Sequence, residues 1–358
     1  MNKKEILETL DKYNLDKEHC IILSGASLVV QDMIKSTSDI DIATTTEFYN
    51  SLDWKSKVGA LGKKIKYIDD IEISNNLYRP DDVVIIDGYK FANLNFILDV
   101  KEMLYRLKDK NIIKTLRKKL YNKSLLNFIG TGDMQNYNLK NTSAYIKFDR
   151  TMLLIDCGMT VFHQLLKSNT LSNLDEIYIA ITHTHPDHVG SLSALLLYLK
   201  FFTNTKINII VNDAFPEQKP HLENLLQIGG VLRDYYNFID VSQINSFFKI
   251  KSERIKHCPE LDSYAYEIII DEDTTYYYLG DNNDIKFFAN KLKALKSNDF
   301  IFTDVSIFNS SVHLNLLELE KITSTSNRKQ VCCIHFPNNE TIEKAKSLGF
   351  EVANIEQN

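Results

Sequence analysis

The sequence is poor in glycine, proline, cysteine and tryptophan, with 12, 6, 5 and 1 of these residues among its 358. The cysteines are odd in number and show no zinc-knuckle spacing, and Cys332 and Cys333 are adjacent within an apolar run. This pattern is typical of buried free thiols, so we expect a protein of the reducing cytosol. The scarcity of glycine and proline says little about function.

Long apolar runs and a strong net charge are also missing. No stretch approaches the roughly 20 apolar residues that a membrane span needs, and the N-terminal segment MNKKEILETL lacks the apolar core of a secretory signal. We therefore expect a cytoplasmic protein without membrane contact. The net charge of −5 gives no general attraction for nucleic acid. The one basic stretch, residues 106–123, is typical of a solvated helix face.

The chain is too long for one typical core and suits two domains. Its 44% hydrophobic and 25% charged residues are those of an ordinary globular protein. Residues 1–122 predict a small α/β domain with helices over 5–14 and 94–120, an apolar strand-like run over 20–30 that is broken at Ser24 and Gly25, strands over 40–43 and 64–73, and a hairpin of 83–86 and 89–92 around Asp87-Gly88.

Residues 123–358 begin with strands and then alternate strands with helices, which predicts a layered α/β sandwich. The boundary, near residues 121–124, depends on this change of pattern alone. The predicted strands cover residues 125–129, 142–148, 152–155, 176–182, 207–211, 264–270, 275–279, 300–303 and 331–334, and the predicted helices cover 191–202, 222–227, 314–323 and 340–348.

A histidine cluster, THTHPDHVGSL, directly follows the predicted strand over 176–182. On an extended turn His183 and His185 point the same way, and Asp187 and His188 follow a proline that fixes the backbone. Two imidazoles can bind one metal ion while a carboxylate and a third imidazole bind a second. These donors suit zinc, and also iron or manganese. Incidental histidines in a loop are the alternative, which their number and spacing disfavour.

The HxHxDH pattern after an apolar strand resembles the metallo-β-lactamase superfamily, from about Leu125 to the end of the chain. FIGTGD and LLIDCG are similar to the family's first two strand–turn segments, and YLGD and CCIHF to its last two motifs. The resemblance implies an αββα sandwich that uses two metal ions, zinc above all, to activate water. The implied ligands are His183, His185 and His257 for one metal, Asp187, His188 and His335 for the other, and Asp281 together with a hydroxide for both.

The same resemblance suggests further roles near the metals. Asp156 would orient a ligand histidine, although an aspartate that caps its own turn is an equal alternative. KHCPELDSYAYEI around His257 resembles the phosphodiesterase branch, which contains tRNase Z-like enzymes and related cyclic-nucleotide phosphodiesterases. In that branch an acidic residue and a histidine form a pair, here Asp304 and His313. His313 would protonate the leaving oxygen, and a helix cap is the alternative role for this residue. Asp187 is also assigned to catalysis, together with Asp304 and His313.

The stretch between His188 and His257 lacks the Gly/Pro-rich arm with which tRNase Z holds tRNA. This departure disfavours precursor tRNA and favours a small nucleotide or a short RNA end as substrate. We expect His163, in a helix, and His221, in a loop beside Pro220, to be surface residues.

LSGASLVVQDMIKSTSDIDIATT, with the later helix KEMLYRLKDKNIIKTL, resembles the nucleotidyltransferase fold. Gly25 and Ser27 would then hold phosphate at a helix start, and Asp39, Asp41 and Glu72 would bind Mg²⁺ for phosphoryl transfer. Gly-Ala-Ser stands where the family has adjacent Gly-Gly or Gly-Ser. A domain that only holds substrate is therefore an alternative, and so is a solvated turn with capping aspartates.

We predict a dinuclear metal-dependent hydrolase, a phosphodiesterase of nucleotide or RNA, behind a nucleotide-handling domain. The fusion supports this prediction because both folds handle nucleotides, which is an argument by analogy. The alternatives are a nucleotidyltransferase with an auxiliary hydrolase domain, a metal-dependent esterase or lactonase, and a non-catalytic interaction module such as an antitoxin-like or defence-related protein. A homodimer is compatible with the sequence.

Overall fold

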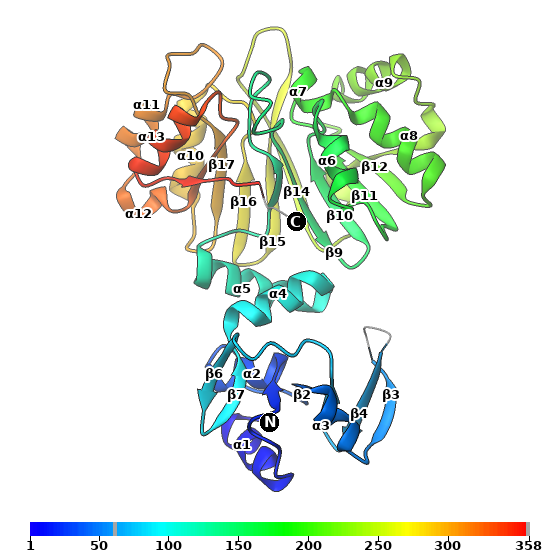
Figure 1. Cartoon of the computed structure of the whole chain (residues 1–358). Helices are drawn as coiled ribbons and strands as arrows, with labels where there is room; N and C mark the ends of the chain where they lie inside the picture. Colours follow the sequence, from blue (N-terminus) through cyan, green and yellow to red (C-terminus); the bar gives the residue numbers. More distant parts are fainter. Residues whose placement is uncertain (60–62, 356–358) are drawn as a thin grey trace. The chain divides into compact units, whose positions relative to one another are not determined.

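The computed structural model describes residues 1–59 and 63–355. The chain folds into two compact units, residues 1–121 and 122–358, and each is described by itself (Figure 1). Both combine helices with strands, so the mixed α/β class is confirmed. Within the described ranges, every helix is too short or too polar to cross a lipid bilayer.

The first unit is built on a seven-stranded mixed sheet with the order β3-β4-β5-β2-β1-β7-β6. The strands are β1 (Cys20–Ile22), β2 (Ile40–Thr44), β3 (Lys55–Val58), β4 (Lys64–Ile68), β5 (Ile71–Ser74), β6 (Val83–Ile86) and β7 (Tyr89–Ala92). The helices are α1 (Lys3–Lys12), α2 (Ser24–Val30), α3 (Thr46–Ser51), α4 (Leu94–Leu104) and α5 (Lys110–Tyr121). The core lies between α1, α2 and the sheet.

The hairpin predicted around Asp87-Gly88 is confirmed. Both residues have positive φ, 51° and 79°, as a two-residue turn between twisted strands requires. The break predicted at Ser24 is confirmed, because the chain turns there (φ 45°) from β1 into α2. Two other predictions for this unit were wrong, because each merged two elements. The chain turns from β4 into β5 at Asp69 (φ 46°) and out of α4 at Tyr105 (φ 46°). A single left-handed residue leaves the hydrophobic pattern intact, so periodicity does not reveal it.

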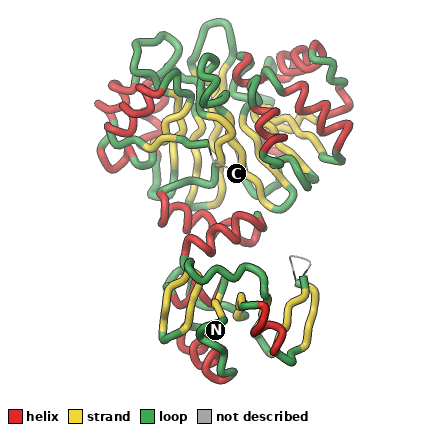
Figure 2. Tube along the Cα trace, in the orientation of Figure 1, coloured by secondary structure: helices red, strands yellow, loops and turns green. Residues whose placement is uncertain are grey.

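The second unit contains two six-stranded sheets, ordered β13-β12-β11-β10-β9-β8 and β14-β15-β16-β17-β18-β19 (Figure 2). The first sheet comprises β8 (Asn127–Gly130), β9 (Ser143–Phe148), β10 (Thr151–Ile155), β11 (Glu176–Ala180), β12 (Lys206–Val211) and β13 (Asn237–Asp240). The second comprises β14 (Lys249–Ile255), β15 (Ser263–Asp271), β16 (Thr274–Tyr278), β17 (Phe300–Asp304), β18 (Val331–Ile334) and β19 (Glu351–Val352).

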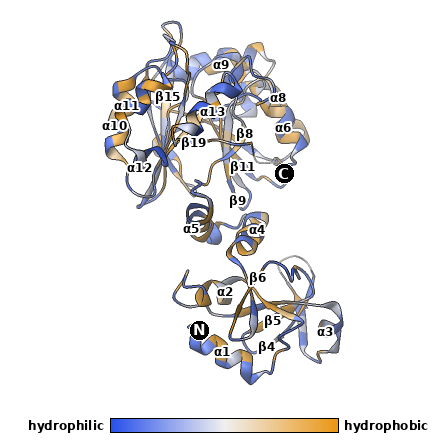
Figure 3. Cartoon of the chain, turned by 60° about the vertical axis from the view of Figure 1, so that its left-hand side comes forward, coloured by the Kyte–Doolittle hydropathy of each residue, from blue (hydrophilic) through white to orange (hydrophobic). Residues whose placement is uncertain are grey.

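Helices cover the outer face of each sheet. Those on the first are α6 (Val161–Lys167), α8 (Leu192–Phe202) and α9 (Gln218–Ile228), and those on the second are α10 (Ile285–Ala294), α11 (Leu316–Ile322), α12 (Thr325–Arg328) and α13 (Asn339–Ser347). Ile177 and Ile179 pack toward the helices, whereas Tyr178 between them contacts Phe248. Phe128 and Phe302 meet between the sheets. These contacts give the layers helix, sheet, sheet and helix, whose apolar residues can be followed in Figure 3.

The parallel strands of each sheet determine where polar residues gather. β10 and β11 run in parallel, and so do β16, β17 and β18. Parallel strands end at one edge of their sheet, so the residues that follow them lie near one another. Strands β13 and β14 and helix α10 were not predicted. β14 is an edge strand in which charged residues outnumber apolar ones, a composition that protects edges and resembles that of a loop.

Candidate metal centre

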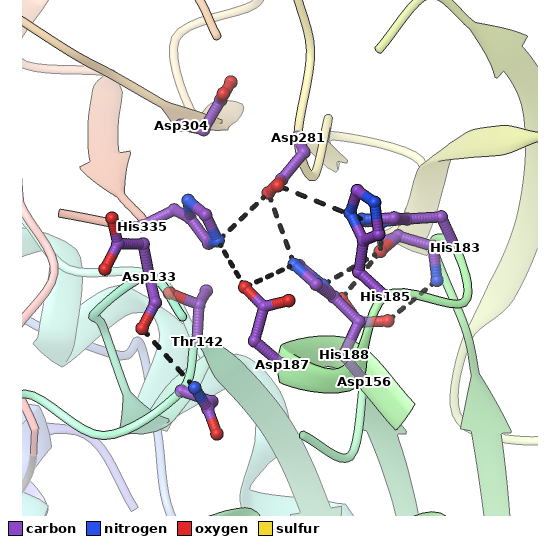
Figure 4. Close-up of polar contacts among 12 residues, drawn as sticks. Asp133, Thr142, Asp156, His183, His185, Asp187, His188, Asp281, Asp304 and His335 are labelled. Atoms are coloured by element: carbon purple, nitrogen blue, oxygen red, sulfur yellow. Dashed lines mark hydrogen bonds and ion pairs between the residues drawn. The ribbon is translucent and has the colours of Figure 1, made fainter. Parts of the chain in front are cut away.

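The structure brings all seven predicted metal ligands together at these strand ends. His183 and His185 lie in the loop after β11, Asp187 and His188 lie in the short helix α7 (Pro186–Val189), and His257, Asp281 and His335 follow β14, β16 and β18. Figure 4 shows the side chains of Asp187, His188, Asp281 and His335 pointing toward one another, with His183 and His185 beside them. His185 is partly exposed, and the other six are at most 5% exposed. Their packing between rigid strands fixes the geometry.

Three imidazoles and one carboxylate form the first group, with ligand atoms that all lie within 4.8 Å of one another. Nδ1 of His185 is 2.9 Å from Nε2 of His183 and 3.3 Å from Nε2 of His257. Oδ2 of Asp281 lies 3.9 Å and 3.7 Å from the same two Nε2 atoms. Nitrogens that face one another around a common centre suit a cation placed among them.

Asp187, His188 and His335 form the second group, again with ligand atoms within 4.8 Å. Oδ2 of Asp187 is 3.2 Å from Nε2 of His335 and 3.5 Å from Nε2 of His188. Oδ1 of Asp281 is 3.4 Å and 3.5 Å from these two nitrogens. Asp281 therefore turns one oxygen toward each group, which is the arrangement of a carboxylate shared by two metal ions.

The residues present fit two divalent cations. Among the described residues, Oδ1 of Asp187, Nε2 of His188 and Oδ1 of Asp281 are buried atoms without a hydrogen-bond partner. A buried polar atom without a partner costs about 1–3 kcal/mol, so three at one point indicate a missing ligand. Imidazole and carboxylate donors of this number suit zinc.

Groups behind the ligands fix their orientation. Oδ1 and Oδ2 of Asp156 accept hydrogen bonds from the backbone N–H and hydroxyl of Thr182 at 2.7 and 2.8 Å, and Oδ2 lies 2.9 Å from Nδ1 of His188. The role predicted for Asp156 therefore agrees with its contacts, since its partners are far along the chain and not in its own turn. Nδ1 of His257 is 2.8 Å from the carbonyl of Val312. Both bonds leave Nε2 of the imidazole free for a metal.

Burial and charge act against each other at this centre. Burial raises the pKa of Asp281, but the charges of His335 and His188 outweigh it and hold that pKa well below its usual range. Burial lowers the pKa of His188, but the charges of Asp281 and Asp156 raise it well above the ordinary value. Burial and the neighbouring imidazoles lower the pKa of His183 well below normal. The carboxylates are therefore ionised at neutral pH, as metal ligands must be.

Asp304 and His313 form a pair beside the metal ligands. Nδ1 of His313 is 2.7 Å from Oδ2 of the buried Asp304, at the end of β17, and 4.0 Å from Oδ2 of Asp281. Burial lowers the pKa of His313, but the hydrogen bond to Asp304 and its charge raise it to about 9. Burial raises the pKa of Asp304 to about 6, against the effect of His313. At neutral pH the pair is an imidazolium and a carboxylate.

The structure argues against two other roles for His313. The cap of α11 belongs to Asn315, whose side chain accepts from the N–H of Leu317, so the alternative of a helix cap is wrong. His313 also forms a third group with Asp281 and His335. However, the nitrogen that approaches Asp281 is Nδ1, which already bonds Asp304, and a metal would compete with that bond.

In the first unit, Asp41 and Glu72 are neighbours on the parallel strands β2 and β5. Both line a cavity of about 170 Å³ together with Arg106, Lys63 and the apolar side chains of α4. Burial, Asp39 and Glu72 raise the pKa of Asp41 to about 6. Asp39 itself is exposed just before β2 and is not among the residues that line the cavity.

The phosphate role predicted for Gly25 and Ser27 does not agree with their positions. Ser27 is fully buried in α2, and its hydroxyl donates to the carbonyl of Ala92 at 2.7 Å. Its side chain therefore joins α2 to β7. A Cβ on Gly25 would lie 2.3 Å from Oγ1 of Thr37, so this glycine allows close packing of the loop before β2.

His163 and His221 are exposed as predicted, but His221 belongs to helix α9 and not to a loop, because Pro220 lies in its first turn. Two residues of the site were missed. Thr182 was assigned to the end of a strand, yet it bonds Asp156 behind the ligands. Asn283 donates to the carbonyls of His257 and Ser311 and ties their loops together. The signal for both is a polar residue one or two positions from a ligand.

Comparisons with known proteins identify the family of this chain. The family described as "Anti-Pycsar protein Apyc1" matches residues 124–354. The Apyc1 protein of Bacillus phage 010DV004 is 29% identical over 240 residues, which cover 60% of this chain and 89% of the relative. Ribonuclease Z of Methanococcus aeolicus is 34% identical over 146 residues, which cover 39% of this chain and 42% of the relative.

Among solved structures, the metallo-β-lactamase fold protein YhfI of Bacillus subtilis is similar, with a TM-score of 0.49 and 20% identity over 63% of this chain and 94% of that one. The matched family segment begins directly after the first unit and contains every candidate metal ligand. It also covers well over half of the sequence. The chain therefore belongs to the Anti-Pycsar Apyc1 family.

Proposed function

We propose that the second unit is a dinuclear zinc-dependent phosphodiesterase that hydrolyses a small nucleotide. The observation that supports this proposal best is Asp281, whose two buried oxygens face two separate groups of ligands at 3.4–3.9 Å. One carboxylate between two such groups has no structural purpose in a core. Membership of the Apyc1 family and the Ribonuclease Z relative support a metal-dependent hydrolase of nucleotides.

Two bound zinc ions would lower the pKa of a water between them and stabilise the negative charge that develops on the phosphate. The side chains would do the rest. Asp281 holds the ligand groups in register, and Asp156 orients the imidazole of His188. His313, protonated because Asp304 raises its pKa, donates a proton to the departing oxygen. A phosphodiester has a poor leaving group near neutral pH, so this donor has a physical purpose.

The chain between the ligands favours a small substrate. Between His188 and His257 lie α8, β12, α9, β13 and β14, which are regular elements of the sandwich with short connections. A long flexible arm that would hold a folded RNA is not among them. A free nucleotide or the end of a short RNA therefore fits this proposal better than precursor tRNA does, and a cyclic nucleotide is the first substrate to test.

One experiment tests the assignment. The purified protein is analysed for bound metals and assayed on bis(4-nitrophenyl) phosphate, cyclic mononucleotides, a short RNA, precursor tRNA, a lactone and a thioester. We expect about two zinc ions per chain and hydrolysis of the phosphodiester and a cyclic nucleotide, lost with a chelator and restored by zinc, manganese or iron. Hydrolysis of the thioester or lactone alone would overturn the phosphodiesterase assignment, and a chain that refuses all three metals would overturn the site.

For the first unit we propose a nucleotide-handling, nucleotidyltransferase-like role with a Mg²⁺ site. The cavity supports it: Asp41 and Glu72 carry like charges on adjacent strands, and Arg106 lies in the same wall, 2.7 Å from Asp109, which the buried Lys101 contacts at 2.6 Å. Carboxylates together with a fixed guanidinium suit a cation and a phosphate. Since Ser27 and Gly25 face elsewhere, binding without transfer is the form we favour.

Isothermal titration of the full chain with Mg²⁺ and nucleoside triphosphates tests this role. Asp41→Asn should abolish binding in the first unit and leave phosphodiester hydrolysis unchanged. His257→Ala is the reciprocal control, because it removes a ligand of the second unit alone. Nucleotide transfer that vanishes in Asp41→Asn would show a transferase. Binding that survives Asp41→Asn would contradict the proposal.

A further inference from the structure

Thr182 lies between the two groups of metal ligands without belonging to either. Its hydroxyl oxygen is 2.8 Å from Oδ2 of Asp156, 3.1 Å from Nδ1 of His183 and 3.3 Å from Nδ1 of His188. His183 belongs to the first group and His188 to the second. One buried hydroxyl therefore contacts an imidazole of each group and the carboxylate behind them.

The hydrogens around Thr182 can be assigned by counting donors and acceptors. The hydroxyl of Thr182 donates its hydrogen to Oδ2 of Asp156, which at 2.8 Å is the nearest of its polar neighbours. The lone pairs of the hydroxyl oxygen then accept a hydrogen from Nδ1 of His183. The hydrogen on Nδ1 of His188 goes to Oδ2 of Asp156, which at 2.9 Å is nearer than the hydroxyl. Each imidazole thus carries its hydrogen on Nδ1 and presents Nε2 to its metal.

Other contacts hold Thr182 in this position. Its backbone N–H donates to Oδ1 of Asp156 at 2.7 Å, and its carbonyl accepts from the N–H of Tyr264 at 2.8 Å. A Cβ on Gly280, the residue before Asp281, would lie 3.0 Å from the Thr182 methyl group. Thr182 is thus held by three parts of the second unit. Asp156 contacts it from the first sheet, Tyr264 contacts it from the second sheet, and the turn that carries Asp281 packs against its methyl group.

We propose that Thr182 is a positioning residue that sets the tautomer of His183 in one metal group and, by holding Asp156, orients His188 in the other, and so supports metal binding at both sites. The proposal rests on the dinuclear site proposed above. Without the hydroxyl, Nδ1 of His183 loses its acceptor, and Asp156 loses one of the donors that hold it against His188. Both metals should therefore bind more weakly after a change at a residue that touches neither of them.

The experiment compares Thr182→Val with Thr182→Ser. Valine keeps the shape and removes the hydroxyl, whereas serine keeps the hydroxyl and removes the methyl. Zinc affinities are measured in a two-step competition with a chromophoric chelator. We expect Thr182→Val to weaken both steps by about 10- to 100-fold, and Thr182→Ser to stay within about threefold of the wild type. The matched control is Thr205→Val, which removes a buried hydroxyl that donates to the carbonyl of Leu174 far from the ligands.

A second readout reports the tautomers directly. Long-range ¹H–¹⁵N spectra of the zinc-loaded protein should show protonated Nδ1 on His183 and His188 in the wild type and in Thr182→Ser. If Thr182→Val does not fold, the spectra of Thr182→Ser still show whether a hydroxyl at this position keeps Nδ1 of His183 protonated. The proposal would be overturned if only one of the two zinc-binding steps weakened, or if Thr182→Ser and Thr182→Val weakened binding equally. Protonated Nε2 on His183 would also overturn it. A wild type that binds no zinc would instead overturn the metal site itself.

Discussion

The two units hold their acidic residues in opposite ways. In the second unit, Asp281 is 3% exposed and surrounded by imidazoles, whose charges hold its pKa well below the usual range despite burial. In the first unit, Asp41 lies beside Glu72 and Asp39, and burial with these like charges raises its pKa to about 6. The charges around Asp281 outweigh its burial, whereas Arg106 and Lys101 lower the pKa of Asp41 too little to do so.

This difference shows what each site requires from a ligand. The second unit places nitrogen and oxygen donors at fixed positions, so a transition-metal ion completes a site that already exists. The first unit holds charges together at a cost in stability, which a bound hard cation would remove. The metal site of the second unit should therefore fail when its geometry is lost, and the acidic cluster of the first unit should gain stability when its charge is removed.

The largest effect is expected from Asp281→Asn in the second unit. An amide cannot bridge two cations as a carboxylate does, so one metal should be lost and the other weakened. Turnover of the phosphodiester should fall on the order of 10³-fold, measured together with metal content. Asp299→Asn is the control, since this buried carboxylate accepts from the backbone of Thr275 and Lys296 and belongs to neither ligand group. Two tightly bound metals in Asp281→Asn would show that Asp281 is not shared.

His313→Ala should lower kcat by about 10²-fold or more and leave the metal content unchanged. The protonated imidazole is the active form, and Asp304 raises its pKa to about 9, so activity should persist at neutral pH and decline on the alkaline side. Bound cations lower this pKa, which places the decline at or below pH 9. A profile of kcat against pH measures it, and the decline should vanish in His313→Ala.

Asp304→Asn sharpens this assignment. Without the carboxylate that raises it, the pKa of His313 should fall, and the alkaline decline of kcat should move to lower pH. Loss of metal from His313→Ala would contradict the role of proton donor and show a ligand instead.

The ligand set of the second unit was predictable because it depends on side-chain chemistry at strand ends. THTHPDH directly follows an apolar strand, so the sequence alone places it at the edge of a sheet. His335 also follows an apolar run, Val331–Ile334, but it was assigned as a ligand through a resemblance. Asp281 and His257 were added through a resemblance, since nothing in their spacing shows that β14 and β16 end beside β11. That proximity is a property of the packed sheets.

The first unit was harder to predict, because its features depend on single backbone conformations and on packing. Ser27 stands where a phosphate-binding residue would, but its direction is set by the contact of α2 with β7, which the sequence does not display. The unpredicted elements α3 and β3 lie between Asp41 and Glu72 in the sequence, yet the two residues are in register on adjacent strands. The missed Thr182 shows the same limit in the second unit, since only the fold brings it to Asp156.

Asp41→Asn should stabilise the first unit at neutral pH. Because the folded state raises the pKa of Asp41, it binds the proton more tightly than the unfolded state, and wild-type stability falls as pH rises from about 4 to about 6. Asparagine does not ionise, so Asp41→Asn avoids this loss of stability. With the partial exposure of Asp41 taken into account, the free energy of unfolding at pH 7 should rise by about 1–2 kcal/mol. The single tryptophan, Trp54, packs in the first unit, so its fluorescence in urea titrations follows that unit alone.

The control for Asp41→Asn is a repeat at pH 4, where both proteins should be equally stable. Saturating Mg²⁺ should stabilise the wild type and not the variant. A variant that is less stable than the wild type at pH 7 would show that Asp41 has a structural partner and that the cluster is not held at a cost.

Ser27→Ala should have the smallest effect and separates packing from phosphate binding in the first unit. The variant loses the bond from the hydroxyl to the carbonyl of Ala92 and the bond that the hydroxyl accepts from Nε2 of Gln31, but Nε2 of Gln31 still donates to that carbonyl at 2.9 Å. No buried acceptor is left unpaired, so the free energy of unfolding followed by Trp54 should fall by only about 1 kcal/mol, with nucleotide affinity unchanged. Unchanged stability with lost nucleotide binding would instead return Ser27 to the phosphate site, because only a ligand would then need its hydroxyl.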